Sequence, residues 1–355
     1  MGDLLDRVAD LVDIGSESYH EAPLVDHIER ELGSVEGLTV DRVGDNLVAR
    51  THLGRGHRLM LAGHTDTVPA DNNGQARREG DTLWGLGSSD MKGGLAIMMQ
   101  LAQTVTTPAI DVSYVFYARE EVTATHSGLE ELFETRPDLL VADAALLGEP
   151  TGGAIEAGCQ GTLRYKVELA GVRAHTARPW NGLNAIHRLG PLLVDVASYE
   201  PRQPLLAGCR YHEGLQVVLA DGGVATNVVP DRASVTINHR FAPDRTPEEA
   251  CAHVLELLEP HLGPDDVCEL TDLAPGAAPG VDHPLLAALV ERNALEVRAK
   301  LGWTDVARLA VRQIPAVNFG PGDASLAHMA DERLERAPLD AGYEALAELL
   351  STGVG

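Results

Sequence analysis

Two histidines and three carboxylates, spread widely along the chain, have local contexts that suit metal binding. They are His64, Asp90, Glu121, Glu149 and His328. Imidazole nitrogen and carboxylate oxygen are ligands that Zn²⁺ accepts, at about 2.0–2.2 Å. Five such side chains suffice for two zinc ions if one carboxylate bridges them. Two ions roughly 3.5–4 Å apart can activate a shared water and polarise a carbonyl group, so the set predicts metal-assisted hydrolysis.

Two further acids stand beside these candidates. Because neighbouring residues point in different directions, Glu121 can bind metal while the adjacent Glu120 faces the attacking water as a general base. Asp66, two residues after His64, could accept the second N–H of the imidazole ring and fix its tautomer. An isolated His-x-Asp is more commonly a surface pair, and an isolated Glu-Glu a solvated face. The hypothesis therefore rests on the joint occurrence of the motifs in this order.

The elements that must position these side chains are the strands of a predicted parallel sheet. Four short apolar runs are typical of strands buried in such a sheet, and each is followed by one or more candidate residues. The runs are residues 59–62, 112–118, 144–147 and 316–319. In open α/β sheets, functional groups collect beyond the carboxyl ends of the strands. The pattern therefore predicts that four strand ends contribute to one site.

Composition excludes several classes of function. The chain has 355 residues and a formal net charge of −25, which argues against nucleic-acid binding because that requires a basic surface. Its four cysteines form no Cys-x-x-Cys pair and are expected to be reduced thiols. The sequence predicts no signal peptide and no membrane span, which would need about 18 consecutive apolar residues. We therefore expect a cytoplasmic protein without nucleic-acid or membrane partners.

The arrangement of predicted elements changes in the middle of the chain. Strands and helices alternate up to about residue 160, which favours an α/β fold, and the alternation resumes over residues 284–349. Between them, residues 163–273 predict a small antiparallel sheet with two helices on one face. We therefore expect a discontinuous domain of residues 1–162 and 274–355 with residues 163–273 inserted as a smaller α+β domain.

The order of the motifs resembles that of the M20 family of metallopeptidases. The motifs are Gly-His-x-Asp-x-Val at 63–68, Gly-x-Gly-x-x-Asp-Met-Lys-Gly-Gly at 85–94, Glu-Glu at 120–121, Gly-Glu-Pro-Thr at 148–151 and a late histidine at 328. This resemblance implies a zinc-peptidase-like catalytic domain, with a mostly parallel sheet between helices, and an inserted dimerisation domain.

The resemblance also implies a role for each candidate residue. Two Zn²⁺ ions per subunit would be bound, one by His64 and Glu149 and the other by Glu121 and His328, with Asp90 bridging them. Co²⁺ or Mn²⁺ could replace zinc, because these ions accept the same ligands. Glu120 would be the general base and Asp66 the supporting acid. The Asp90–Met91 peptide would be cis.

The inserted domain is expected to contribute to the active site. A lone histidine in a loop is more commonly a surface group, but residues 171–179 resemble the family's dimerisation domain. The resemblance implies that His175 reaches the active site of the partner subunit in a homodimer and stabilises the oxyanion. The candidates for binding substrate are Arg178, Asn227, Arg240, Thr304 and Asp305.

The segments 155–162, 302–305 and 318–323 are most similar to the actinobacterial desuccinylases of the family. The resemblance implies hydrolysis of N-succinyl-LL-2,6-diaminopimelate to succinate and LL-2,6-diaminopimelate, in lysine and diaminopimelate biosynthesis. The alternative is another acyl-amino-acid hydrolase of the family, such as an acetylornithine deacetylase, or a carboxypeptidase. A metal-binding relative without activity is more remote, because a binding protein needs no general base.

Overall fold

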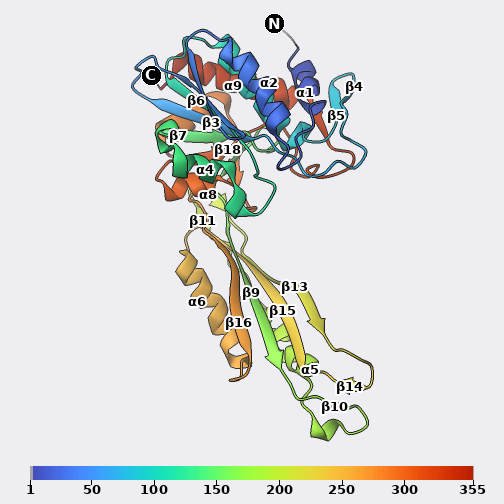
Figure 1. Ribbon diagram of the computed structural model, residues 1–355. Helices are drawn as coiled ribbons and strands as arrows, with labels where there is room; N and C mark the ends of the chain where they lie inside the picture. The colour runs from blue at the N-terminus through green and yellow to red at the C-terminus, as the bar shows by residue number, and fades with distance from the viewer. Residues whose placement is uncertain (1–2, 355) are drawn as a thin grey trace. The chain divides into compact units, whose positions relative to one another are not determined.

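The computed structural model describes residues 3–354, which form two compact units (Figure 1). The first unit contains the chain up to Ala157, residues Pro279–Arg298 and the chain from Arg308 onwards. The second contains Gly158–Ala278 and Ala299–Ala307. The segment 163–273, predicted to be an insertion, lies within the second unit. No helix among the described residues is long and apolar enough to cross a membrane.

The first unit is built on an eight-stranded sheet in the order β1-β2-β6-β3-β7-β18-β8-β17. Its four central strands are parallel: β6 (Asp111–Tyr117), β3 (Arg58–His64), β7 (Ala144–Leu147) and β18 (Ala316–Asn318). The outer strands are β1 (Leu38–Val43), β2 (Asn46–Thr51), β8 (Ile155–Ala157) and β17 (Val297–Ala299). Because the central strands are parallel and buried, their carboxyl ends meet at one edge of the sheet, as predicted.

The helices of the first unit cover this sheet. They are α1 (Leu4–Val12), α2 (Ala22–Gly33), α3 (Gly93–Thr104), α4 (Gly128–Thr135), α7 (Pro284–Asn293) and α9 (Arg336–Thr352), with α8 (Val306–Val311) at the return from the second unit. The buried α3 packs against α1 and α9. It begins at Gly93, because Asp90 and Met91 before it have non-helical φ and ψ. The peptide bond between Asp90 and Met91 is cis. The cis peptide confirms the expectation from the family resemblance.

The second unit has a four-stranded antiparallel sheet in the order β13-β15-β9-β16. The strands are β13 (Gly214–Gly222), β15 (Arg232–Phe241), β9 (Gly161–Ala170) and β16 (Val267–Ala274). Side chains alternate between buried and exposed along β9 and β15, and the buried ones form a core with α5 (Ala185–Ala197) and α6 (Pro247–Leu258). A mainly parallel central sheet and a separate antiparallel sheet with two helices confirm the predicted fold class.

Candidate metal centre

His64 is the last residue of β3 and is 1% exposed. Its Nδ1 atom lies 3.0 Å from the main-chain oxygen of Asp66 and 3.6 Å from the Oδ1 atom of that residue, while its Nε2 atom lies 3.1 Å from Oδ1 of Asp90. Two acceptors beside Nδ1 favour the tautomer that carries its proton there. The Nε2 lone pair is then directed to the side of the ring where Asp90 lies.

The carboxylate of Asp90 lies between two imidazole rings. Its Oδ1 atom faces His64, and its Oδ2 atom is 3.8 Å from Nε2 of His328. The same Nε2 atom is 2.8 Å from Oε1 of Glu121. The ligand atoms of His64, Asp90 and Glu121 all lie within 4.8 Å of one another. Asp90 therefore presents one oxygen toward each of two histidines, as a carboxylate that bridges two metal ions does. These residues fit a metal centre.

The electrostatic surroundings of the histidines also favour a cation. Burial alone would lower the pKa of His64, but the hydrogen bonds with Asp66 and Asp90 and the charge of Glu149 raise it well above its usual value. Burial likewise opposes protonation of His328, and its hydrogen bond with Glu121 outweighs that effect and raises its pKa. The acids that favour a proton here would equally favour a bound metal cation.

Glu149 follows β7 and is 6% exposed. Its charge acts on His64. The structure therefore brings His64, Asp90, Glu121 and His328 into contact, and places Glu149 near enough for its charge to act on His64.

Asp66 supports two parts of this site at once. Besides its contact with His64, its Oδ1 atom accepts the backbone N–H of Glu120 at 2.9 Å, and its Oδ2 atom accepts that of Glu121 at 3.0 Å. The hydroxyl of Ser18 donates a further bond of 2.7 Å to Oδ2. Burial raises the pKa of Asp66, but the contact with His64 and these hydrogen bonds lower it to about 2. The sequence predicted that the carboxylate of Asp66 accepts the imidazole N–H. In the structure the carboxylate lies 3.6 Å from Nδ1, and the main-chain oxygen is nearer, at 3.0 Å. The sequence predicted neither Ser18 nor the backbone bonds.

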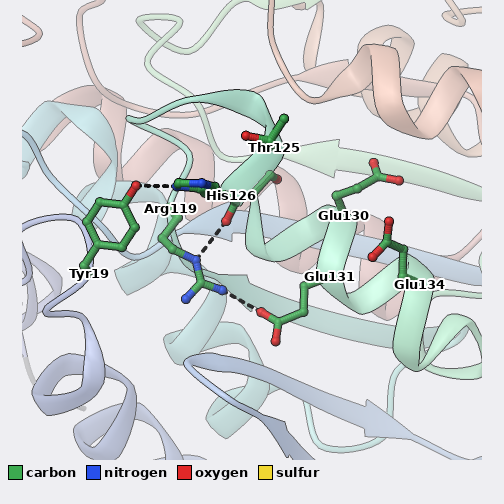
Figure 2. A pocket seen from close by; sticks show the side chains of 8 residues that line it. Tyr19, Arg119, Thr125, His126, Glu130, Glu131 and Glu134 are labelled. Carbon is green, nitrogen blue, oxygen red and sulfur yellow. Dashed lines mark hydrogen bonds and ion pairs between the residues drawn. The ribbon is translucent and has the colours of Figure 1, made fainter.

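Arg119 turns the chain just before Glu120 and has a φ of 62°. Its guanidinium donates to the main-chain oxygen of His126 at 2.8 Å and to Glu131 at 2.5 Å, as Figure 2 shows. Tyr19, which is hydrogen-bonded to His126 at 2.6 Å, helps to line a surface pocket of about 400 Å³ with them. Among the described residues, no predicted metal ligand lines this pocket, so it is distinct from the metal centre.

A buried carboxylate that the sequence analysis missed contacts the backbone at Asp90. Oε1 of Glu332 accepts the N–H groups of Ser89 and Asp90, at 2.9 and 3.0 Å. Glu332 is 1% exposed. In the sequence, Glu332 is marked only by its position four residues after His328. That position does not predict a contact with a loop more than 200 residues away.

The other six predicted site residues belong to the second unit. His175, Arg178 and Asn227 are exposed and lie together, where β10 (Ala174–His175) pairs with β14 (Val228–Val229). The main-chain oxygen of His175 accepts the N–H of Arg178 at 2.8 Å, and that of Asn227 accepts the N–H of Thr176 at 3.1 Å. This group is thus placed by a short two-stranded ribbon.

Arg240, Thr304 and Asp305 lie elsewhere in the second unit. Arg240 is near the end of β15, directly opposite Thr162 of β9, and burial together with the charge of Arg164 lowers its pKa. Thr304 and Asp305 are buried, and the main-chain oxygen of Thr304 accepts a bond of 3.8 Å from the thiol of Cys159. The six residues therefore form two groups at different places along the second unit.

The sequence of the chain is similar to those of known proteins over almost its whole length. Residues 60–352 match the profile of peptidase family M20/M25/M40. A Mycobacterium tuberculosis protein provisionally named succinyl-diaminopimelate desuccinylase DapE is 49% identical over 350 residues, which are 98% of each chain. The succinyl-diaminopimelate desuccinylase of Corynebacterium glutamicum is 45% identical over 341 residues, 94% of this chain and 92% of its own.

Solved structures show the same fold. Aminopeptidase PepT from Bacillus cereus superposes with a TM-score of 0.80 at 20% identity, covering 98% of this chain and 97% of its own. The YXEP protein of Bacillus subtilis, described as a dinuclear metal binding peptidase, has a TM-score of 0.70 at 16% identity, with 99% and 97% covered. At such identities the likeness concerns the fold alone.

Proposed function

Because the chain belongs to peptidase family M20/M25/M40, we propose that it hydrolyses N-succinyl-LL-2,6-diaminopimelate to succinate and LL-2,6-diaminopimelate. Two relatives that bear the name of this activity are 49% and 45% identical over nearly the full chain. The structural observation that carries the proposal is the carboxylate of Asp90, which presents one oxygen to His64 and the other to His328. Such a carboxylate is what a two-metal hydrolase needs as its bridge.

We assign His64 and Glu149 to one metal ion and Glu121 and His328 to the other, with Asp90 shared. The donor set of nitrogen and oxygen suits two Zn²⁺ ions, and Co²⁺ or Mn²⁺ could take their place. When bound, the ions supply positive charge that acidifies water and polarises the amide carbonyl.

The residues of the chain then hold the reacting groups and move the proton. Asp66 keeps the Nδ1 proton of His64 in place and anchors the backbone at Glu120. Glu120 takes the proton from the attacking water and returns it to the leaving amine, the two roles of a general base and a general acid. The leaving group is an amine that must be protonated before it departs, so one carboxylate in both roles completes the cycle.

The substrate carries carboxylates at its succinyl end and at its α-carbon. The planar guanidinium of arginine binds both oxygens of such a group. We assign this role to Arg240, whose pKa is lowered by burial, and a second contact to Arg178. Asn227, Thr304 and Asp305 complete the proposed substrate-binding set.

A homodimer explains how these residues could serve one substrate. The ribbon that carries His175 adjoins the start of β15, where the N–H of Gly171 bonds to the main-chain oxygen of Asp231. Arg240 is near the other end of that strand, about 25 Å away at roughly 3.3 Å per residue. One small substrate cannot span that distance, so we propose that His175 acts on the substrate held by the partner subunit and stabilises its oxyanion.

Exposed apolar side chains on the second unit support the same proposal. They lie on α5 and on the edge strand β13, and are Ile186, Leu193, Val194, Val218 and Leu219. An edge strand and an adjoining helix with apolar side chains in water are typical of a surface that a partner covers. A two-fold symmetric dimer would bury the same surface on both copies.

A parallel assay tests the proposed activity. The purified protein, loaded with zinc, should hydrolyse N-succinyl-LL-2,6-diaminopimelate far faster than N-acetylornithine or simple dipeptides. Higher turnover of N-acetylornithine or of a dipeptide would assign the protein a different substrate specificity within the same family. Two zinc ions without hydrolysis of any of these amides would identify a metal-binding protein and reject the enzyme.

A further inference from the structure

Glu332 is a buried acid whose side chain contacts the backbone of the predicted bridging ligand. Both of its hydrogen bonds to Ser89 and Asp90 end on one oxygen, Oε1. Burying a carboxylate is costly, and burial raises the pKa of Glu332. Two backbone N–H groups compensate part of this cost. An acid retained at such a cost suggests a role beyond packing.

A second buried charge accompanies it. Lys92 is 2% exposed, and its Nζ atom donates to the main-chain oxygen of Ile14 at 2.9 Å. Its ammonium interacts with the charge of Glu332. Glu332 thus holds Ser89 and Asp90, and Lys92 holds the chain two residues after Asp90.

Glu332 belongs to the segment that carries His328. Its N–H bonds to the main-chain oxygen of Met329, so the turn between His328 and Glu332 is closed. Its main-chain oxygen accepts the N–H of Gly85 at 3.0 Å, and the hydroxyl of Ser89 donates to the main-chain oxygen of Arg333 at 2.7 Å. These contacts and the two bonds to Oε1 join the segment of His328 to the loop of Asp90.

We propose that Glu332 is a positioning residue that fixes the spacing between Asp90 and His328, and thereby the affinity for the second metal ion. The inference rests on the metal centre of the proposed function. His64 is held separately, by β3 and Asp66. Loss of the Glu332 contact should therefore lower the affinity for the ion that His328 binds, and leave the affinity for the ion at His64 unchanged. Residues behind the ligands of a metal typically change affinity about 10–100-fold.

The test is a Zn²⁺ titration of the full-length apoprotein against a chromophoric chelator. The wild type should bind two ions, and fewer would reject the metal centre itself, whatever the variants do. Glu332→Ala should bind the second ion about 10–100-fold more weakly and the first ion as the wild type does. Glu332→Gln, whose amide oxygen can accept both N–H groups, should stay within a few-fold of the wild type.

Asp111 offers a matched control. It is 4% exposed, and its carboxylate accepts the N–H groups of Leu53 and Arg55 at 2.8 and 2.9 Å, at the first residue of β6 and away from the metal centre. Asp111→Ala should lower the thermal stability of the apoprotein without changing either metal affinity. If Glu332→Ala does not fold, Glu332→Asp serves instead. Its side chain is shorter by one methylene, and it should bind the second ion more weakly than the wild type does. Equal affinities in the wild type and in folded Glu332→Ala or Glu332→Asp, or equal losses in Asp111→Ala, would overturn the proposal.

Discussion

Oδ1 of Asp66 accepts the backbone N–H of Glu120 at 2.9 Å. The acid that orients the imidazole of His64 thus also fixes the backbone of the proposed general base. A movement of Asp66 would displace a proposed metal ligand and the proposed base together. The two proposed functions of the site, holding metal and moving a proton, would be coupled through this one residue.

Asp66→Asn should therefore impair both functions. An amide can offer an oxygen to only one of the two N–H groups of Glu120 and Glu121, and its NH₂ group would oppose the other. We expect zinc affinity and kcat each to fall about 10–100-fold. Ser18→Ala, which removes one hydroxyl donor to the same carboxylate, should have a much smaller effect. Unchanged zinc affinity in Asp66→Asn would contradict the coupling.

Glu120→Gln should separate chemistry from metal binding. The variant should keep the fold and two metal ions and lose about 10²–10⁴-fold in kcat, since a positioned base contributes that much. Metal analysis and steady-state kinetics on the same sample measure both. Glu121→Gln is the control, because it should lose metal as well as activity. Near-normal turnover in Glu120→Gln would assign the base to another residue.

The predictability of the site from sequence differed between its parts. The proposed metal ligands His64 and Glu149 follow apolar strands, and parallel strands bring their carboxyl ends together, so a local pattern predicted that they lie close to one another. Helix α6, one of the two helices predicted for residues 163–273, has a local start signal, because Thr246 caps it and Pro247 is its first residue. Ser18 and Glu332 act across long separations in the chain, and no local periodicity encodes such contacts.

Mixing two inactive variants tests whether His175 acts across a dimer. If Glu120→Gln and His175→Ala exchange subunits, half of the dimers are mixed, and each has one site with both groups intact. Activity should then return to about a quarter of the wild-type value under two-fold symmetry. Size-exclusion chromatography of tagged subunits confirms the exchange. If activity stays absent after proven exchange, His175 does not act in the partner's site.

The stability of the second unit should fall in mild acid because of His239. Burial lowers its pKa to about 4, and the bond of its Nδ1 to the main-chain oxygen of Gly214 offsets only part of that. Below about pH 6.5, the ordinary pKa of histidine, His239 is protonated in the unfolded chain but stays neutral in the folded chain. Its contribution to the free energy of unfolding should therefore fall by about 2 kcal/mol between pH 7 and pH 5. Urea unfolding at both pH values measures this. His239→Phe should remove that part of the slope.

Strand β18 lies between β7 and β8 in the sheet, although β7 ends at Leu147 and β18 begins only at Ala316. A ribosome that adds about 5–20 residues per second needs roughly 10–30 s to make the stretch between them. During that time the nascent first unit lacks an interior strand, and β7 presents an unpaired edge to other chains. The strands and helices of the second unit, residues 161–274, emerge in the same interval and can pair among themselves. A chaperone that shields β7 until β18 arrives would therefore affect the yield of folded protein more than its final stability.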